Sequence, residues 1–227
     1  MIGLRWYVNK KIREMVVRVD SVTILSSVRR VYKNVELSHA LGVSEATLSK
    51  YYHGITIPAY PMAERLLKNL LSEEFAKKCV GKFMNRVGWD LRKACIDPHF
   101  INYVTIYLKY KLLEKLPGLH LDKFISLPDY SLSIASHLST YLEVPLVMST
   151  EEDMIIGLET KSRPPTLLQR GDYVISVHAV LNREIAEYFK YLADMHNLKY
   201  VAALTIILMD EKRVSEILKT TILSLIP

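Results

Sequence analysis

The stretch VELSHALGVSEATLSKYYHGITIP, residues 35–58, decides how the first part of the chain folds. The residues before Gly42 predict a short helix that ends there, because glycine readily takes the left-handed backbone that a tight turn between two helices needs. Ser44 can cap a second helix that runs to about His53. The apolar and aromatic positions that would pack around this turn are Leu37, Leu41, Val43, Leu48 and Tyr51. The stretch therefore predicts two short helices joined by a tight turn.

The second of these helices is expected to expose its first residue and one of its faces to solvent, because neither packs in the core. The residues expected there are Ser44, Glu45, Ala46, Ser49, Lys50 and His53. When such a helix lies in the major groove, side chains at these positions reach the edges of the bases. We therefore predict that they contact double-stranded DNA. The alternative is a helical hairpin with a glycine turn and no role in DNA binding.

LSHALGVSEATLSKYYHG, followed by the Gly54-x-x-x-Pro58 step into a further helix, resembles the Cro/C1 (lambda-repressor-like) helix-turn-helix family. The resemblance covers about residues 20–72 and implies an all-α DNA-binding domain at 1–72. Around it, Asp20 is expected to cap a helix that follows a separate one at 12–19. Residues 73–96 predict a helical linker.

The basic residues are concentrated in the first part of the chain, within a net charge of +6. Residues 1–90 hold 15 Lys and Arg against 8 Asp and Glu, whereas residues 91–227 hold 15 against 16. A basic N-terminal part beside a near-neutral part is typical of a protein that faces nucleic acid. A solvated basic surface without a nucleic-acid partner would give the same counts.

From about residue 97 the pattern changes: Pro98 is expected to open a long helix to about Leu116, and after it short apolar runs alternate with helical segments. The expected strands are 124–127, 146–148, 154–159, 173–177 and 200–209, and the expected helices are 131–141, 182–196 and 213–225. This alternation predicts βαβ units and a parallel sheet with covered faces. The predicted fold class is α/β, with an N-terminal all-α domain followed by a parallel-sheet domain at 97–227.

Two stretches of this part of the chain resemble the type I phosphoribosyltransferase fold. They are KFISLPDYSLSIASHLSTYLEVPLV (123–147) and GDYVISVHAVLNREIAEYFKYLADMHNLKYVAALTIILMDE (171–211). In active members the corresponding stretches carry a pyrophosphate loop, a pair of acids and a phosphate loop. Here the acid pair is replaced by His178 and Ala179, and neither loop (128–131 and 181–184) contains glycine. We therefore expect a catalytically degenerate domain without a cofactor, so that the chain is not an enzyme. The alternative is an active phosphoribosyltransferase of nucleotide salvage with an autoregulatory DNA-binding domain.

Two roles are left for a degenerate domain: a scaffold for dimerisation, or a pocket that senses a nucleotide-like small molecule. In the second case the hydroxyls of Ser131 and Ser133 would bind an anion at a helix start. Lys161, Arg163 and Arg183 would add positive charge to this ligand site.

Several functional classes are disfavoured by composition. The longest apolar run has ten residues, whereas a membrane-spanning helix needs about 20. The N-terminus lacks a signal-peptide pattern, and Cys79, Cys95 and the histidines show no disulfide or metal-site spacing. We therefore predict a cytoplasmic, homodimeric transcription regulator with no metal and no membrane partner, resembling archaeal regulators that fuse these two modules. A structural or RNA-associated protein is the remaining alternative.

Overall fold

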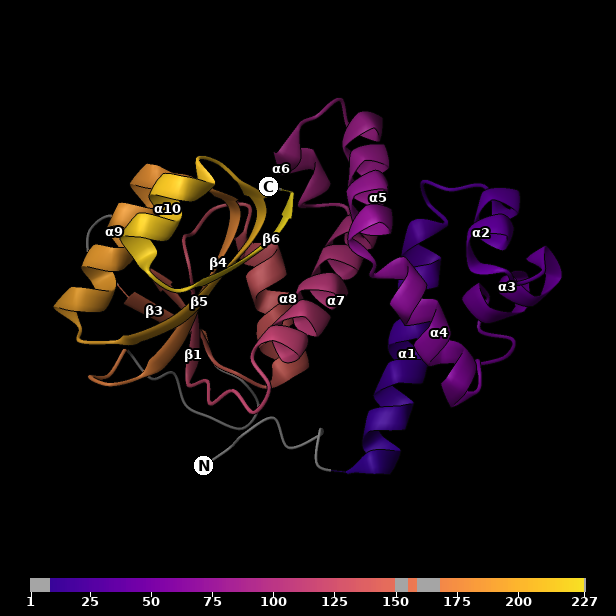
Figure 1. The fold of residues 1–227 in the computed structure, drawn as a ribbon, viewed down its shortest axis with the longest axis horizontal. Coiled ribbons are helices and arrows are strands. Elements are labelled where there is room, and N and C mark those ends of the chain that lie inside the picture. Colours follow the sequence, from indigo (N-terminus) through magenta and orange to yellow (C-terminus); the bar gives the residue numbers. More distant parts are fainter. Residues whose placement is uncertain (1–8, 150–154, 159–167, 227) are drawn as a thin grey trace. The chain divides into compact units, whose positions relative to one another are not determined.

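The computed structural model describes residues 9–149, 155–158 and 168–226 (Figure 1). The described residues form two compact units, a helical unit up to Tyr110 and a sheet unit from Lys111 onward. The division falls inside one helix, later than the boundary at 97 that the sequence suggests. The segment expected as a linker, 73–96, belongs to the helical unit.

The helical unit contains α1 to α6 and most of α7. Their bounds are α1 Lys10–Val28, α2 Asn34–Leu41, α3 Glu45–Tyr52, α4 Tyr60–Leu70, α5 Glu73–Arg86, α6 Leu91–Ala94 and α7 Pro98–Lys115. Its core is apolar, with Ile24 and Leu25 of α1 and Leu66 and Leu70 of α4 fully buried. Tyr103 of α7 is also buried and donates its hydroxyl to the Leu70 carbonyl at 2.8 Å, which ties α7 to this unit.

The expected break before Asp20 is absent, because α1 is one continuous helix. Asp20 lies in its middle, 3% exposed, and does not cap a helix. Its Oδ2 accepts a hydrogen bond from Lys109 Nζ at 2.5 Å and from the Tyr110 hydroxyl at 2.9 Å. The prediction was wrong because it used only neighbouring residues, whereas the partner of this carboxylate lies on α7. A buried charge needs such an opposite charge close by.

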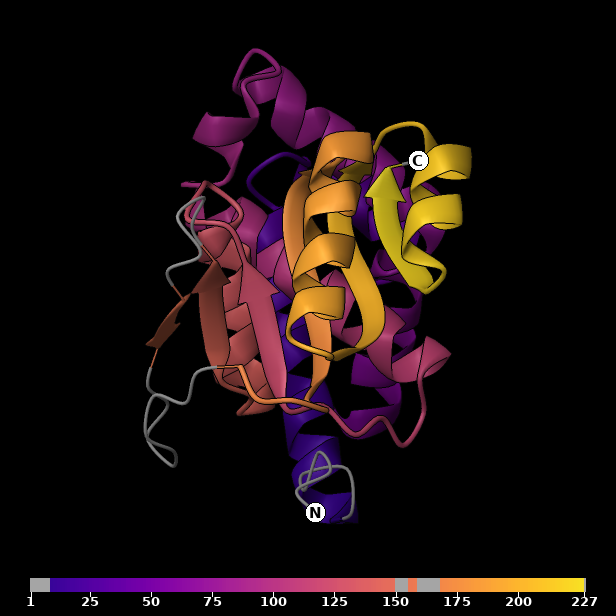
Figure 2. The ribbon, with the colours of Figure 1, turned by 90° about the vertical axis from the view of Figure 1, so that its left-hand side faces the viewer.

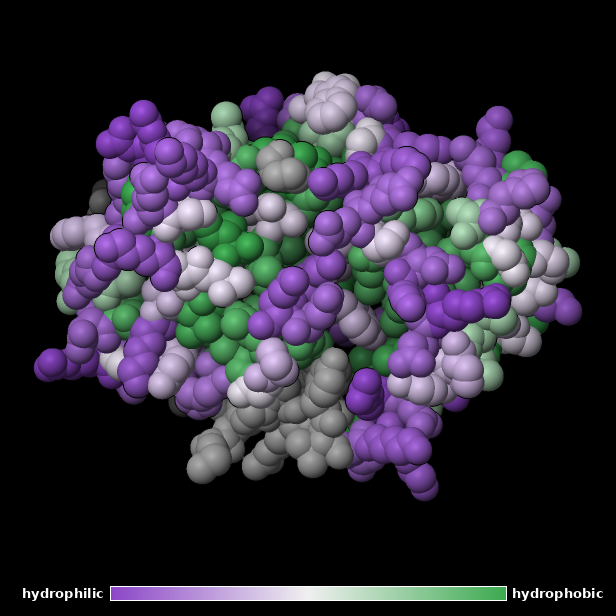
Figure 3. Space-filling view, in the orientation of Figure 1, coloured by the Kyte–Doolittle hydropathy of each residue, from purple (hydrophilic) through white to green (hydrophobic). Residues whose placement is uncertain are grey.

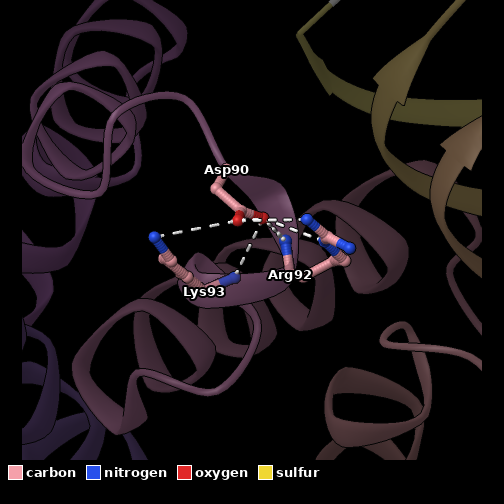
Figure 4. Close-up of polar contacts among 3 residues, drawn as sticks. All are labelled: Asp90, Arg92 and Lys93. Carbon is pink, nitrogen blue, oxygen red and sulfur yellow. Dashed lines mark hydrogen bonds and ion pairs between the residues drawn. The ribbon is translucent and has the colours of Figure 1, made fainter.

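A second aspartate does cap a helix, as Figure 4 shows. Asp90 Oδ1 accepts hydrogen bonds from the backbone N–H groups of Arg92 at 3.1 Å and Lys93 at 3.4 Å, and from Arg92 Nε at 3.2 Å. The hydrogen bond from Arg92 is the main cause that lowers the pKa of Asp90. These contacts satisfy the start of the four-residue helix α6, so the cluster is a helix cap.

The sheet unit is an α/β structure with one mixed sheet. Its bounds are β1 Lys123–Ser126, α8 Leu132–Leu142, β2 Leu146–Ser149, β3 Ile155–Leu158, β4 Tyr173–Leu181, α9 Arg183–Met195, β5 Lys199–Leu208, α10 Glu211–Leu218 and β6 Thr221–Ile226. The strand order is β3-β2-β1-β4-β5-β6, and only β3 is antiparallel to its neighbour. Helices α9 and α10 cover one face and α8 covers the other (Figures 1 and 2). The predicted parallel sheet with covered faces is therefore confirmed.

The end of the chain differs from the prediction of one helix over 213–225. Helix α10 ends at Leu218, and Lys219 takes a left-handed conformation with φ 50°. The chain then forms β6, which pairs with β5 in parallel. The six residues of β6 are uncharged and include a threonine and two isoleucines, a composition that suits a strand.

The face drawn in Figure 3 is mostly hydrophilic, with apolar patches among the polar residues. No helix in the described ranges is long and apolar enough to cross a membrane. Among the same residues, no group of three His, Cys, Asp or Glu side chains could hold a metal ion. Cys79 and Cys95 are both buried and neither is in a disulfide, and burial raises the pKa of Cys79.

Candidate functional site

The turn between α2 and α3 has the geometry that the sequence predicts. Gly42 ends α2 in the left-handed region, with φ 61° and ψ 38°, and its N–H donates to the Ser38 carbonyl. Ser44 begins α3, where its Oγ accepts from the Thr47 N–H at 3.2 Å. Glycine permits the sharp change of direction and the serine satisfies a backbone donor that the helix start would leave free. The two residues together fix where α3 begins.

Apolar side chains hold the pair of helices together. Leu37 and Leu48 are fully buried, and Leu41 and Val43 are at least 93% buried. Tyr51, expected in the core, is half-buried. With four apolar residues locked between the helices, α3 has one buried face and one outer face.

The outer face of α3 carries the residues predicted to contact DNA. Glu45, Ala46, Lys50 and His53 are exposed, and Ser49 is half-buried. Their helical spacing puts them on one side of α3, opposite the buried Leu48. Ser44 is also exposed, but its hydroxyl lies 2.8 Å from Thr47 Oγ1 and serves as the helix cap.

One basic residue near this face, Arg29, is not among the residues that the sequence predicts to contact DNA. The exposed Arg29, just after α1, holds its guanidinium 4.1 Å from the centre of the Tyr52 ring. Ser26 of α1 donates to the Tyr52 carbonyl at 3.2 Å, so the end of α1 is fixed beside the end of α3. Nothing in local sequence spacing relates Arg29 to residues more than 20 positions away. The packing of α1 beside α3 therefore places the Arg29 cation next to the end of the outer face.

The helical unit and the sheet unit differ in net charge more than residues 1–90 and 91–227 do. Residues 5–110 hold 18 Lys and Arg against 9 Asp and Glu, a net charge of +9. Residues 111–227 hold 12 against 15, a net charge of −3. The exposed face of α3 therefore belongs to a strongly basic unit, which attracts a polyanion.

At the carboxyl end of β1, the start of α8 is occupied by a carboxylate of the chain itself. Asp129 Oδ1 accepts from the Ser131 N–H at 2.7 Å and from the Ser131 hydroxyl at 2.5 Å. Ser131 is 1% exposed and also contacts Ser126 Oγ at 2.9 Å. Ser133, half-buried, donates to the Tyr130 carbonyl at 3.2 Å. An anion at this helix start would have to displace Asp129.

The other residues predicted to bind a ligand are separated from these serines. Arg183 begins α9, on the opposite face of the sheet from α8 (Figure 1). It is exposed, and its Nε donates to Glu187 at 2.7 Å. Lys161 and Arg163 lie outside the described residues. The described part of this set therefore does not converge on one pocket.

The position of the expected acid pair lies inside β4. His178 is 2% exposed and Ala179 is 1% exposed, so both side chains are part of the core. His178 Nε2 lies 2.6 Å from Ser176 Oγ, and its ring meets the Phe189 ring edge-on at 4.6 Å. Burial lowers the pKa of His178 to about 3, so the imidazole is neutral at physiological pH. It supplies no charge toward a sugar or a metal.

The residues at the position expected for a phosphate loop, 181–184, belong to the end of β4 and the start of α9 and do not form a loop. Leu181 is the fully buried last residue of β4, where it packs in a cluster with Ala186 and Leu208. Asn182 follows as the cap of α9, and its Oδ1 accepts from the Ile185 N–H at 2.9 Å. Strand β4 therefore passes into α9 through a single capping residue.

Comparison with known proteins gives a likeness in fold. No protein-family model and no curated protein matches the chain. Adenine phosphoribosyltransferase from Saccharomyces cerevisiae is 14% identical over 57% of this chain and 80% of its own, with a TM-score of 0.46. UMP synthase from Leishmania donovani is 21% identical over 60% of this chain and 29% of its own, with a TM-score of 0.44. Adenine phosphoribosyltransferase from Trypanosoma brucei is 9% identical over 65% of this chain and 68% of its own, with a TM-score of 0.44.

Each of these matches has a TM-score below 0.5 and is a likeness in fold alone, which for the first covers 57% of the chain. The prediction that the chain is not an enzyme excluded catalysis, whereas all three of these solved structures are enzymes by name. That prediction rested on the missing acid pair at His178 and Ala179 and on the absence of glycine from two loops. A shared fold at these identities leaves the activity undecided, since function depends on the site and not on the fold. The prediction was wrong to exclude catalysis on these residue types.

Proposed function

We propose that this protein is a transcription regulator that binds double-stranded DNA, with α2 and α3 forming a helix-turn-helix of the Cro/C1 type. The observation that carries the proposal is the α3 geometry: a left-handed Gly42, a Ser44 cap, a buried Leu48 and a polar outer face. A helix held this way presents its outer side chains together and can enter the major groove. The net charge of +9 on residues 5–110 supports a polyanionic partner.

Different residues of the site are suited to different parts of DNA. The Ser49 hydroxyl and the Lys50 ammonium can hydrogen-bond to base edges, with guanine O6 and N7 as the acceptors that a lysine prefers. Arg29, at the end of α3, is placed to contact a phosphate, which adds affinity without sequence preference. Specificity should therefore depend on Ser49 and Lys50, and salt-dependent affinity on Arg29.

The test is a selection of bound sequences from a random duplex pool, followed by titration of the selected site. Replacing Lys50 with alanine should weaken binding by about 1–3 kcal/mol and relax the preference at one or two base pairs. Lys77→Ala is the matched control, since it removes the same charge from the exposed surface of α5. It should keep the sequence preference.

Two results would contradict DNA recognition by α3. One is a pool that shows no enriched sequence, and the other is an unchanged preference in both Lys50→Ala and Ser49→Ala. Equal affinity for an RNA duplex of the same sequence would favour the RNA-associated alternative.

Phosphoribosyl transfer by the sheet unit is the second candidate function. The observation that favours it is the arrangement of β1 and β4, which lie side by side with Ser126 opposite Val177. Each strand leads into a helix, α8 or α9, that starts at their carboxyl ends. In open α/β sheets, ligands bind at this edge, and a helix start favours an anion such as phosphate, which at the start of α8 would have to displace Asp129. Arg183 would add a positive charge there.

The direct assay supplies phosphoribosyl pyrophosphate, Mg²⁺ and purine or pyrimidine bases in turn. If the candidate holds, nucleotide and pyrophosphate form in equal amounts, and Arg183→Ala lowers the rate. Lys190→Ala is the matched control, because Lys190 pairs with Asp194 on α9 as Arg183 pairs with Glu187. Absence of nucleotide with every base would remove this candidate. Binding without turnover would instead assign the edge to a nucleotide-like effector.

A further inference from the structure

The outermost strand of the sheet, β6, has a neighbour on one side only. It pairs with β5 in parallel from Ala202 opposite Thr221 to Ile207 opposite Ile226. Within the described ranges no strand lies on its other side, and Figure 2 shows β6 in yellow at the end of the sheet. The outward-pointing N–H and C=O groups of such a strand form a template for another strand.

Natural edge strands are usually protected against pairing, and β6 itself carries none of the protection that the sequence or register of a strand can provide. Short length, charged side chains, proline and bulges are the common devices. β6 has six residues, Thr-Ile-Leu-Ser-Leu-Ile, with no charge, glycine or proline, and its register with β5 shows no bulge at Thr221–Leu223 or beyond. At the opposite edge, β3 has only four residues and contains Gly157. The β6 edge is therefore the one suited to pairing.

The sequence of β6 indicates which strand fits it. Residues 222–226 read Ile-Leu-Ser-Leu-Ile, which is the same in both directions around Ser224. In an antiparallel pair centred on Ser224, Leu223 of one copy lies opposite Leu225 of the other, and Ile222 lies opposite Ile226. Residues directly opposite in an antiparallel pair share a face, so leucines meet leucines and isoleucines meet isoleucines.

Burial supports the same pairing. Leu223 and Leu225 are 9% and 2% exposed, so they already belong to the core and hold β6 in place. Ile222, Ser224 and Ile226, on the other face, are half-buried. Ile222 packs at the margin of the cluster that contains Val214 of α10. A second copy of β6 would extend this margin and cover the half-buried isoleucines of both copies.

We propose that β6 is the dimer interface of this protein and that its partner is β6 of a second copy, paired antiparallel about a two-fold axis at Ser224. The two sheets then join into one continuous sheet, and the same surface serves both copies, as a two-fold interface requires. The sheet unit carries a net charge of −3 and the strand itself carries none, so no strong repulsion opposes this contact. The proposal does not depend on DNA binding or on catalysis.

The test uses the full chain and the charge of residue 224. Wild-type protein at micromolar concentration should have twice the 26.1 kDa chain mass by light scattering. Ser224→Lys and Ser224→Glu should each be monomeric, because like charges would face each other across the axis. An equimolar mixture of the two should restore the dimer mass. Ser136→Lys is the control and should stay dimeric, because Ser136 is half-buried as Ser224 is but lies on α8 and outside β6.

A monomeric wild-type protein, or a dimer that survives both single substitutions, would overturn the proposal. Circular dichroism checks that each variant is folded. If either variant fails to fold, amide exchange of the wild-type protein decides the question. Protection of residues 221–226 that increases with protein concentration supports the proposal, and protection independent of concentration refutes it.

Discussion

The buried histidine of β4 should make folding stability depend on pH. His178 is enclosed by the core, with Ser176 Oγ at 2.6 Å and the Phe189 ring at 4.6 Å. Ser176 is in turn hydrogen-bonded to the Tyr200 hydroxyl, and burial raises the pKa of that phenol, so Tyr200 is neutral as well. A proton added to His178 would create a buried charge beside these neutral groups.

The sign of the effect follows from the two pKa values. In the folded protein burial lowers the pKa of His178 to about 3, whereas an unfolded chain has the ordinary value of about 6.5. Between these values the unfolded state binds the proton and the folded state does not. The stability that the neutral histidine provides is therefore fully present above about pH 6.5 and is lost as the pH falls toward 3. Between pH 7 and pH 5 the loss amounts to about 2 kcal/mol.

The assay is urea unfolding of wild-type protein and His178→Leu at pH 7 and pH 5. Leucine cannot titrate, so the variant should lack about 2 kcal/mol of the pH-dependent loss that the wild-type protein shows. Ser149→Ala is the control, because it removes a buried hydroxyl that bonds to Tyr188 and removes no titrating group. Its cost should be the same at both pH values. An equal pH dependence in wild-type protein and His178→Leu would refute the reasoning.

Two further substitutions test the helical unit. Asp20→Asn should destabilise the protein by about 3–5 kcal/mol in urea unfolding, because it removes the carboxylate that pairs with the buried Lys109 ammonium. A loss below about 1 kcal/mol would contradict a strong contribution from this buried pair. Gly42→Ala should cost about 1–2 kcal/mol, because alanine is strained at φ 61° although no atom lies within 4 Å of the added methyl group. Gly81→Ala, inside α5 and equally uncrowded, should instead stabilise by about 0.5–1 kcal/mol, and equal effects of the two changes would disprove a backbone cause.

Features set by neighbouring residues were predictable from the sequence. The turn at Gly42 and the cap at Ser44 follow from the conformational range of glycine and from the hydrogen bond between Ser44 and Thr47. The outer face of α3 follows from helical spacing alone. The strands at 124–127 and 200–209 are confirmed within a few residues, because apolar runs bounded by polar turns and alternating with helices favour buried parallel strands.

Features set by distant residues were not predictable in the same way. The role of Asp20 depends on Lys109, which is 89 positions away, and a cap and a buried ion pair look alike in the local sequence. The C-terminal segment 213–225 has apolar residues at both helical and alternating spacing, and the free edge of β5 decides in favour of a strand after Lys219. The cation beside α3, Arg29, is brought there by α1 packing. The sequence shows these residues but not their partners.

The proposed DNA contact and the proposed dimer can fail independently, because they use different residues in different units. If both hold, the dimer carries two α3 helices to one DNA molecule, and a symmetric site with two half-sites is the natural target. Ser224→Lys should then weaken binding to the full site while leaving the preferred half-site sequence unchanged. Lys50→Ala should change the preferred sequence while leaving the mass of the protein unchanged. A Ser224→Lys variant that dissociates yet binds the full site as tightly as wild-type protein would separate dimerisation from DNA recognition, and it would leave the assignment of β6 intact.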